Sequence, residues 1–238
     1  MPKKQKYIAI IPARGGSKEL KNKNILEIAS VPLIAYSIKA AQISKTISDV
    51  YVSTDSAKIA KIAKDYGARV IKRPANLATD SAKQDDVMKH AVTYLEKKLK
   101  RKISSIILLQ ATSPIREKND IDRAVEKFEK LKVDALFSSV HIDLCVWRKK
   151  LKNLLPVNFT VEERGNRQHA ETDLVENGSI YITKVKCYFS KKIRFGNKRA
   201  THIMKKFSIF EIDNIEEFKL IDMMIESKSK IFKDIVRF

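Results

Sequence analysis

Short apolar runs alternate with amphipathic segments along the first 140 residues of the chain. The apolar runs predict strands at residues 7–12, 49–53, 68–71, 106–110 and 135–140. Apolar residues at helical spacing between these runs predict helices that start at Pro32, after a cap at Asp55 or Ser56, and over 85–100 and 120–131. This alternation predicts a doubly wound α/β fold with a mostly parallel sheet, whose ligands bind beyond the carboxyl ends of the strands.

Residues 141–176 interrupt the alternation, because they carry many charges and few clear periodicities. Strand character returns at 178–182 and 207–212, and an amphipathic helix follows at 215–227. No linker rich in Gly, Pro or Ser divides the chain, so we expect one domain over 1–238 with 141–176 as an excursion. The only tryptophan, Trp147, lies in this excursion, which suggests burial against another subunit.

Composition narrows the classes of protein. No apolar run approaches the length of a membrane span, and Cys145 and Cys187 lack metal-ligand or redox spacing, which favours a reducing cytoplasm. The net charge of +20 suits nucleic acid, a membrane surface or small polyanionic substrates. Many lysines, such as Lys58 and Lys61, recur at helical spacing, which indicates solvated helix faces.

A cationic loop with two glycines follows the first predicted strand. Gly15 and Gly16 can take positive φ, so their amides can converge on an anion that Arg14, Lys18 and Lys23 neutralise. Alternatively, the segment is an ordinary turn with basic residues on its surface. It lacks the Walker A and dinucleotide-binding spacings, so the chemistry it favours is a nucleoside triphosphate held by amides and charge.

Three further polar clusters also follow predicted strands or the excursion, at residues 110–116, 167–169 and 211–213. The amide of Gln110 is placed to read a sugar or a base, whereas Arg116 is expected to anchor the turn. Glu211 and Asp213 lie two residues apart on a predicted strand, so both carboxylates face one side, where hard oxygen ligands suit Mg²⁺. The alternative is that Asp213 caps the following helix.

Five motifs occur in order along the chain: IIPARGGSK with KNKN, VSTD at 52–55, LLQATSPIR at 108–116, NGSIYI at 177–182 and EID at 211–213. Together they resemble those of the acylneuraminate cytidylyltransferases, which are CMP-sialic acid synthetases and their relatives for other keto-sugar acids. The resemblance runs from the first strand to the last helix. It implies a nucleotidyltransferase of Rossmann-like fold that joins CTP to a nine-carbon or eight-carbon keto-sugar acid and releases pyrophosphate.

The resemblance also implies roles for individual residues. The nucleotide-binding residues would be Ala13, Arg14, Gly15, Lys18, Lys23, Asn24, Arg73 and Ala82. Arg14 and Lys23 would be catalytic, because they neutralise charge that grows on the phosphates. The sugar would be contacted by Gln110, Arg148, Arg167, Asn177 and Tyr181, and Mg²⁺ would be held by Glu211 and Asp213. It further implies a cytoplasmic homodimer whose 141–176 segment reaches the partner's site. The general base is left open.

Departures from the family pattern leave the sugar open. Sialic acid synthetases often carry an arginine shortly before the Asn-Gly pair, where Leu174-Val175-Glu176 stands here. The first metal acid is usually Asp and here is Glu211, and Lys83-Gln84 replaces small hydroxyl residues near the cytosine pocket. Two other functions remain as alternatives. One is nucleotidyl transfer to a sugar 1-phosphate or similar phosphorylated acceptor, and the other is nucleic-acid binding, which the scattered lysines and few aromatic residues disfavour.

Overall fold

A computed structural model describes residues 6–161, 173–190, 193–227 and 229–238. Its strands are β1 (Tyr7–Pro12), β2 (Glu27–Ile28), β3 (Val31–Pro32), β4 (Ile47–Thr54), β5 (Arg69–Lys72), β6 (Ser105–Leu109), β7 (Ala135–Ile142), β8 (Trp147–Lys150), β9 (Asn153–Pro156), β10 (Asp173–Lys184) and β11 (Arg199–Ile203). Its α-helices are α1 (Leu33–Ile43), α2 (Ala57–Asp65), α3 (Gln84–Leu99), α4 (Asp120–Leu131), α5 (Val185–Tyr188) and α6 (Ile215–Glu226). Short 3-10 helices are η1 (Lys23–Ile25), η2 (Ala75–Leu77), η4 (Ile193–Phe195), η5 (Lys206–Ile209) and η6 (Lys230–Phe232).

A seven-stranded sheet with the order β11-β7-β10-β6-β1-β4-β5 forms the centre of the molecule. β1 pairs in parallel with β4 and β6, β4 with β5, and β7 with β11. Only β10 runs antiparallel to its neighbours, β6 and β7. The prediction of a mostly parallel sheet is therefore confirmed, and the reversed strand adds a feature that the apolar pattern does not indicate.

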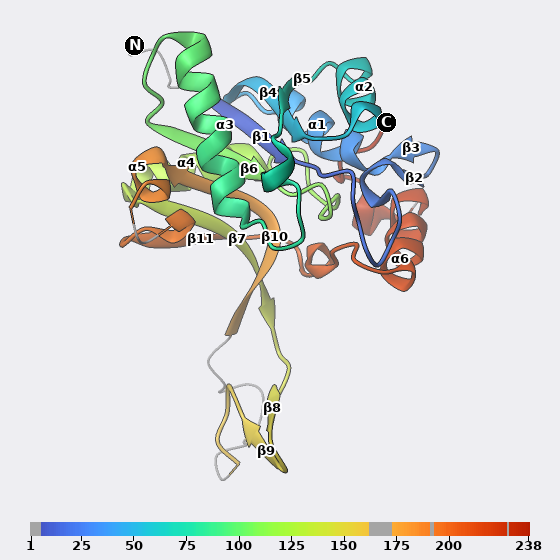
Figure 1. The fold of residues 1–238 in the computed structure, drawn as a ribbon. Helices are drawn as coiled ribbons and strands as arrows, with labels where there is room; N and C mark the ends of the chain where they lie inside the picture. The colour runs from blue at the N-terminus through green and yellow to red at the C-terminus, as the bar shows by residue number, and fades with distance from the viewer. Residues whose placement is uncertain (1–5, 162–172, 191–192, 228) are drawn as a thin grey trace.

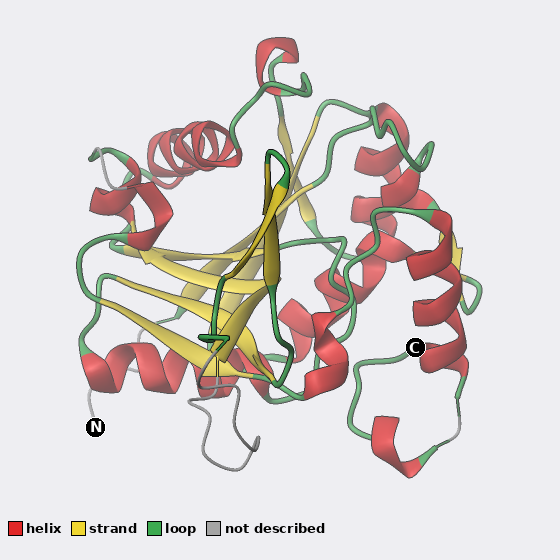
Figure 2. Cartoon of the chain, turned by 90° about the horizontal axis from the view of Figure 1, so that it is seen from below, coloured by secondary structure: helices red, strands yellow, loops and turns green. Residues whose placement is uncertain are grey.

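Helices cover both faces of the sheet (Figure 2). α1, α2 and α4 bury apolar residues such as Ile38, Ile59 and Val125 on one face. α3 and α5 cover the other face, where Met88 packs in a cluster with residues of β1 and β6. This two-sided cover explains why the central strand β6 reads as an unbroken apolar run.

The excursion is a projecting arm. β7 and β10 continue past the sheet as a two-stranded ribbon in which Val140 pairs with Val175, and the β8–β9 hairpin lies at its far end (Figure 1). We call residues 140–161 and 173–176 the arm. It exposes large apolar side chains, among them Leu151 at 90% and Leu154 at 65%. Trp147 is 44% exposed and packs edge-on against Phe159, so within one chain the ring is not buried.

The predicted strand at 207–212 is wrong. Residues 206–209 form η5, which is closed by a hydrogen bond from the Ser208 amide to the Lys205 carbonyl, and no strand follows it. The edge position beside β7 belongs instead to β11. The sequence analysis missed β11 because an edge strand has a single paired neighbour, and its residues, RATHI, show no continuous apolar run.

The C-terminal segment packs on its own domain. Ile235 and Val236 are buried, and the Val236 amide donates to the carbonyl of Arg116 at 2.9 Å. The Phe238 ring meets Tyr36 and Tyr66 edge-on. Within the described ranges, no helix has the length and apolar character needed to cross a membrane.

Candidate active site

A cleft of about 550 Å³ opens at the carboxyl ends of β1, β5 and β6. Pro12, Arg73 and Gln110, at or just beyond those ends, contribute to its walls. The predicted residues that line it are Arg14, Lys18, Lys23, Asn24, Arg73, Ala82, Gln110 and Asp213. The edge of the sheet at which ligands bind in doubly wound folds therefore carries most of the predicted nucleotide site.

The loop after β1 is shaped differently from the prediction. The glycines with positive φ among the described residues are Gly67, Gly178 and Gly196, so Gly15 and Gly16 do not use that freedom. Gly15 is instead required by close packing, since a Cβ there would lie 2.9 Å from the Cβ of Ser56. Its amide donates to Asp55 Oδ1 at 3.0 Å.

Two residues of the predicted nucleotide set hold this loop in place from within. Ala13 is buried, and its amide donates to the carbonyl of Ser53 on β4. The Asn24 side chain is 7% exposed, and its Nδ2 donates to the Arg14 carbonyl at 3.0 Å. Both contacts fix the backbone from which the Arg14 side chain reaches the cleft.

Carboxylates pair with each of the three cationic side chains. Asp80 lies 2.6 Å from the Arg14 guanidinium and 2.8 Å from Lys18 Nζ. Asp213 lies 2.7 Å from Lys23 Nζ. The cleft therefore concentrates positive charge, as predicted, but keeps it balanced by acids from two other parts of the chain.

Gly178 lies directly beneath Gln110 and Glu211. It takes φ +65° where the register of β10 shifts, and a Cβ there would lie 2.7 Å from Gln110 Nε2 and 2.6 Å from Glu211 Cδ. This glycine lets the amide and the carboxylate approach the β10 backbone together. The Asn-Gly pair of the sequence motif thus has a physical reason.

Glu211 and Asp213 flank a buried residue although they do not lie on a strand. Ile212 is fully buried, and its amide donates to the Thr112 carbonyl at 2.8 Å. Burial, followed by the charge of Asp213, raises the pKa of Glu211 above its usual range. Asn214 caps α6 in a capping box with Glu217, so the alternative role of Asp213 as the cap is excluded.

Arg73 forms part of the cleft wall. Its side chain is almost buried and donates to the Ser53 carbonyl at 2.6 Å and to Ser53 Oγ at 3.3 Å. Burial lowers the pKa of its guanidinium to about 10, so it remains charged at neutral pH. A fixed positive charge in this wall suits an anionic ligand.

The prediction that Asn177 faces the sugar is wrong. Its side chain is fully buried, accepts from Ser138 Oγ at 2.6 Å and donates to Ser208 Oγ at 2.9 Å. The Tyr181 ring is also buried, in the core beneath α3, and its hydroxyl donates to Glu176. The register shift in β10 turns Asn177 towards β7, which the strand pattern does not reveal.

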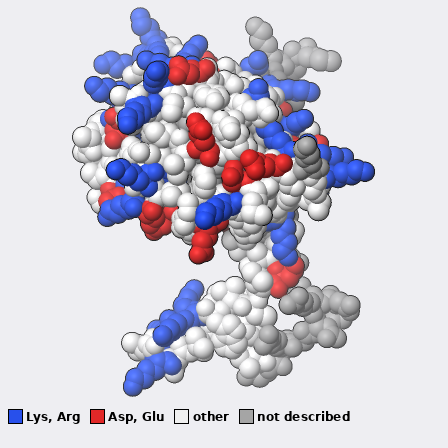
Figure 3. Space-filling model, turned by 90° about the vertical axis from the view of Figure 1, so that its right-hand side faces the viewer, with Lys and Arg blue, Asp and Glu red and all other residues white. Residues whose placement is uncertain are grey.

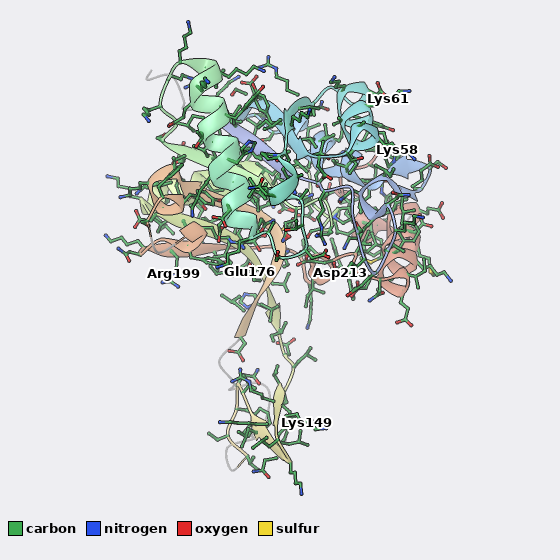
Figure 4. All side chains as sticks on the ribbon, in the orientation of Figure 1. Lys58, Lys61, Lys149, Glu176, Arg199 and Asp213 are labelled. Carbon is green, nitrogen blue, oxygen red and sulfur yellow. The ribbon has the colours of Figure 1, made fainter. Side chains whose placement is uncertain are left out.

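Of the two arginines predicted in the excursion, the structure describes Arg148, and it places this residue away from the cleft of its own chain. Arg148 lies on β8, exposed, in the distal hairpin of the arm. Arg167 lies outside the described residues. Figure 4 shows this separation, since Asp213 and Glu176 lie at the edge of the domain and Lys149 lies far out on the arm.

Arg116 anchors the turn after β6, as predicted. It is fully buried, and its guanidinium donates to Ser37 Oγ at 2.9 Å and to the carbonyls of Gln110 at 2.7 Å and Ser179 at 2.9 Å. It thereby joins α1, the end of β6 and the bulge of β10. Burial lowers the pKa of its guanidinium to about 9.

The sequence analysis missed Asp80 and Arg194. Asp80 stands in a loop without periodicity, so no pattern marked it. Arg194 contacts Gln84, which lines the cleft, lies 3.3 Å from Asp85 and stacks over the Tyr181 ring. It links the start of α3 to β10, and only the fold brings these segments together.

The surface charge agrees with the expectation of solvated helix faces. Lys58 and Lys61 project outward from α2 (Figure 4). On the face drawn in Figure 3, basic side chains are spread out and interspersed with acidic ones. That face carries no continuous basic surface of the kind that a nucleic acid requires.

The fold and the cleft define a nucleotidyltransferase. The chain belongs to the cytidylyltransferase family, whose pattern matches residues 8–232. It is 36% identical to the CMP-N,N'-diacetyllegionaminic acid synthase of Campylobacter jejuni, over 95% of this chain and 98% of that protein. It is 34% identical to the N-acylneuraminate cytidylyltransferase of Escherichia coli, over 94% of this chain and 53% of that longer protein.

A solved structure of a CMP:2-keto-3-deoxy-manno-octonic acid synthetase complexed with CTP has the same fold. It superimposes with a TM-score of 0.67 at 15% identity and covers 92% of this chain and 98% of its own. The resemblance stated from the sequence motifs is thus confirmed at the level of family and fold.

Proposed function

We propose that this chain joins CTP to a nonulosonic acid, forming the CMP-sugar and pyrophosphate. One observation carries the proposal: Arg14, Lys18 and Lys23 meet Gln110 and Asp213 in a single cleft of about 550 Å³. A cavity of this size is in the range that holds a small-molecule ligand. The similarity to an N-acylneuraminate cytidylyltransferase and to a CMP-N,N'-diacetyllegionaminic acid synthase supports the same reaction.

The reaction is a substitution at the α-phosphorus of CTP. The anomeric hydroxyl of the sugar acid forms a new P–O bond, loses its proton to solvent or a base, and the bond to the pyrophosphate oxygen breaks. Arg14, Lys18 and Lys23 are placed to stabilise the negative charge that grows on the leaving group. Arg73, held rigidly by Ser53, adds a further positive charge to the wall of the cleft.

Glu211 and Asp213 fit Mg²⁺. Their charges repel each other, and Glu211 is half-buried, so a divalent cation between them would relieve an unfavourable arrangement. Two carboxylates would leave the remaining positions of the ion to water and to substrate phosphates. When bound, Mg²⁺ would polarise the phosphates of CTP.

We further propose a cytoplasmic homodimer that forms through the arm. Exposed leucines on the arm support an interface between copies, and two free cysteines support a reducing compartment. In such a dimer Arg148, remote from its own cleft, is available to the partner's site, and the family resemblance implies the same of Arg167. The arm is thus the element through which two sites would be completed.

The test is pyrophosphate release from CTP with Mg²⁺ and a panel of N-acetylneuraminic, legionaminic, pseudaminic and ketodeoxyoctulosonic acids, with a sugar 1-phosphate as a further acceptor. We expect turnover with one or more free acids, and its loss in Arg14→Ala. Lys58→Ala, an exposed change on α2, is the matched control. Turnover with the sugar 1-phosphate alone would contradict the proposal and support the alternative acceptor.

A further inference from the structure

In the loop after β1, the three cationic side chains and the Gly15 amide each contact a carboxylate. Asp80 contacts Arg14 and Lys18, Asp213 contacts Lys23, and Asp55 accepts from the Gly15 amide. Asp213 has a separate use as a proposed metal ligand, and Asp55 lies beside the cap of α2. Asp80 has neither role, yet it contacts two of the three cations.

The ion pairs of Asp80 contribute little to the stability of the fold. Its side chain is 46% exposed, and those of Arg14 and Lys18 are 32% and 75% exposed. Ion pairs this accessible add little to folding stability. Asp80 is also carried by a short connection between η2 and α3, in which an Ala82 amide to Thr79 carbonyl bond closes one turn. The pairs therefore join the loop after β1 to the connection between η2 and α3.

The charged form of the Asp80 carboxylate is favoured by its two partners. Hydrogen bonds from Lys18 and Arg14 hold its pKa below the usual range. It therefore presents an anion to the two side chains that we assign to the triphosphate. Any phosphate that binds there must replace Asp80 or share these cations with it.

We infer that Asp80 competes with bound phosphates for Arg14 and Lys18. This competition weakens the binding of pyrophosphate and of CTP, and it selects against ligands that carry a single phosphate charge. This inference rests on the proposed function. A chain of several phosphates interacts more strongly with the two cations than one carboxylate does, so it displaces Asp80. The single phosphate of CMP or of a CMP-sugar does not displace it. Asp80 then re-forms its pairs as pyrophosphate leaves, which favours release over retention of the product.

Such weakening does not oppose catalysis. Interactions that bind substrate and transition state equally lower KM without raising kcat. A built-in carboxylate that reduces ground-state affinity, and that is already displaced when the phosphates are bound, leaves the barrier of the bound complex unchanged. It also keeps the site from being blocked by the pyrophosphate that the reaction makes.

The experiment is calorimetric titration of pyrophosphate, CTP and CMP into wild type, Asp80→Asn and a control, first with a chelator and then with Mg²⁺. The control is Asp86→Asn, because the Asp86 side chain is 45% exposed, pairs with Lys89 at 3.1 Å and lies outside the cleft. We expect Asp80→Asn to bind pyrophosphate and CTP between about two- and tenfold more tightly, as loss of exposed ion pairs allows. CMP affinity should rise by at least as much, because a ligand with a single phosphate then gains access to Arg14 and Lys18.

Equal or weaker pyrophosphate binding by Asp80→Asn would overturn the inference, and so would an equal gain in Asp86→Asn, which would make it an effect of net charge. Asp80→Ser is the second variant, and thermal unfolding verifies that each protein is folded. Wild type that binds neither pyrophosphate nor CTP under either condition would overturn the proposed function itself. The two failures are thus distinguished by the wild-type titration.

Discussion

Single glycines decide the shape of the site more than its charged residues do. Gly178 allows Gln110 and Glu211 to lie against the β10 backbone, and its φ of +65° is one that other residues rarely adopt. Gly15 allows the phosphate loop to pack against Ser56. In both cases the missing side chain positions neighbours that carry chemistry.

Gly178→Ala is expected to abolish most of the cytidylyl transfer and to lower the free energy of unfolding by about 1–2 kcal/mol, because the methyl group displaces Glu211 and strains the backbone. The measurements are kcat and urea unfolding. Gly196→Ala is the matched control, because its φ is +54° and its Cβ would meet Asp134, away from the cleft. It should lose comparable stability and keep its kcat. Equal kcat in both variants would contradict the assigned role of Gly178.

The residues that the sequence located correctly share one physical property. Arg14 and Gln110 stand within two residues of the ends of β1 and β6, and Lys18 and Lys23 stand in the segment after β1, so the topology of a parallel sheet brings all four to one edge. Asn177 failed because its orientation depends on a register shift. Asp80 was missed because its loop becomes part of the site only through tertiary structure.

At the level of elements, the start of α6 gives the neighbouring residues Asp213 and Asn214 different partners. Asn214 accepts from the Glu217 amide at 2.9 Å, while Asp213 turns to Lys23. The sequence pattern left open whether Asp213 caps the helix or holds Mg²⁺. The capping box leaves Asp213 available to the cleft.

Asn214→Ala is expected to cost about 1 kcal/mol of unfolding free energy, which is the usual effect of losing an N-cap, and to retain activity. Asp213→Ala should show the reverse: little change in stability and a large loss of Mg²⁺-dependent turnover. Urea unfolding and pyrophosphate release measure the two effects. If Asp213→Ala instead destabilised the fold as much as Asn214→Ala, its assignment to the site would be wrong.

The opposite end of the sheet depends on Asp134, just before β7. Hydrogen bonds from Lys184 and from the Lys198 amide lower the pKa of its carboxyl to about 2. Because the folded-state pKa is below the unfolded value of about 3.9, this stabilisation is present above pH 4 and is lost as the pH falls towards 2. Chemical unfolding between pH 6 and pH 2.5 should show this loss in wild type. Asp134→Asn should be less stable at pH 6 and show a shallower decline, and parallel profiles would argue against the assignment.

At the scale of the whole molecule, the arm exposes several large apolar side chains to solvent, which is unfavourable for a free monomer. Its large apolar residues with the highest exposure are Leu144, Leu151 and Leu154. Surface of this kind on a projecting ribbon favours contact with a second copy. In the proposed dimer the arm would form the interface and would set the environment of Arg148.

We expect sedimentation to give twice the 27.2 kDa chain mass, and Leu151→Asp with Leu154→Asp to shift the protein to monomer. An unpaired charge buried in an apolar interface is strongly unfavourable, whereas Lys152→Ala on the same arm should leave the dimer intact. A double variant that remains dimeric would place the interface elsewhere.

Mixed dimers test whether two chains share one site. Arg14→Ala and Arg148→Ala chains, each inactive alone, should recover part of the activity when combined, because one of the two sites would contain both arginines. The measurement is pyrophosphate release by a purified heterodimer that carries two affinity tags. Absence of recovery would assign Arg148 to a role within its own chain or on the surface.

The reversal of β10 has a consequence for how the molecule can respond to force and to partners. Its backbone leaves the arm at Glu176, passes under Gln110 and Glu211 at Gly178 and then enters the centre of the sheet between β6 and β7. With a parallel strand in this place, the arm would emerge at the far edge, away from the chemistry. Here the arm and the acidic end of the cleft share one continuous backbone, so a partner that binds the arm would act directly on the geometry of the site.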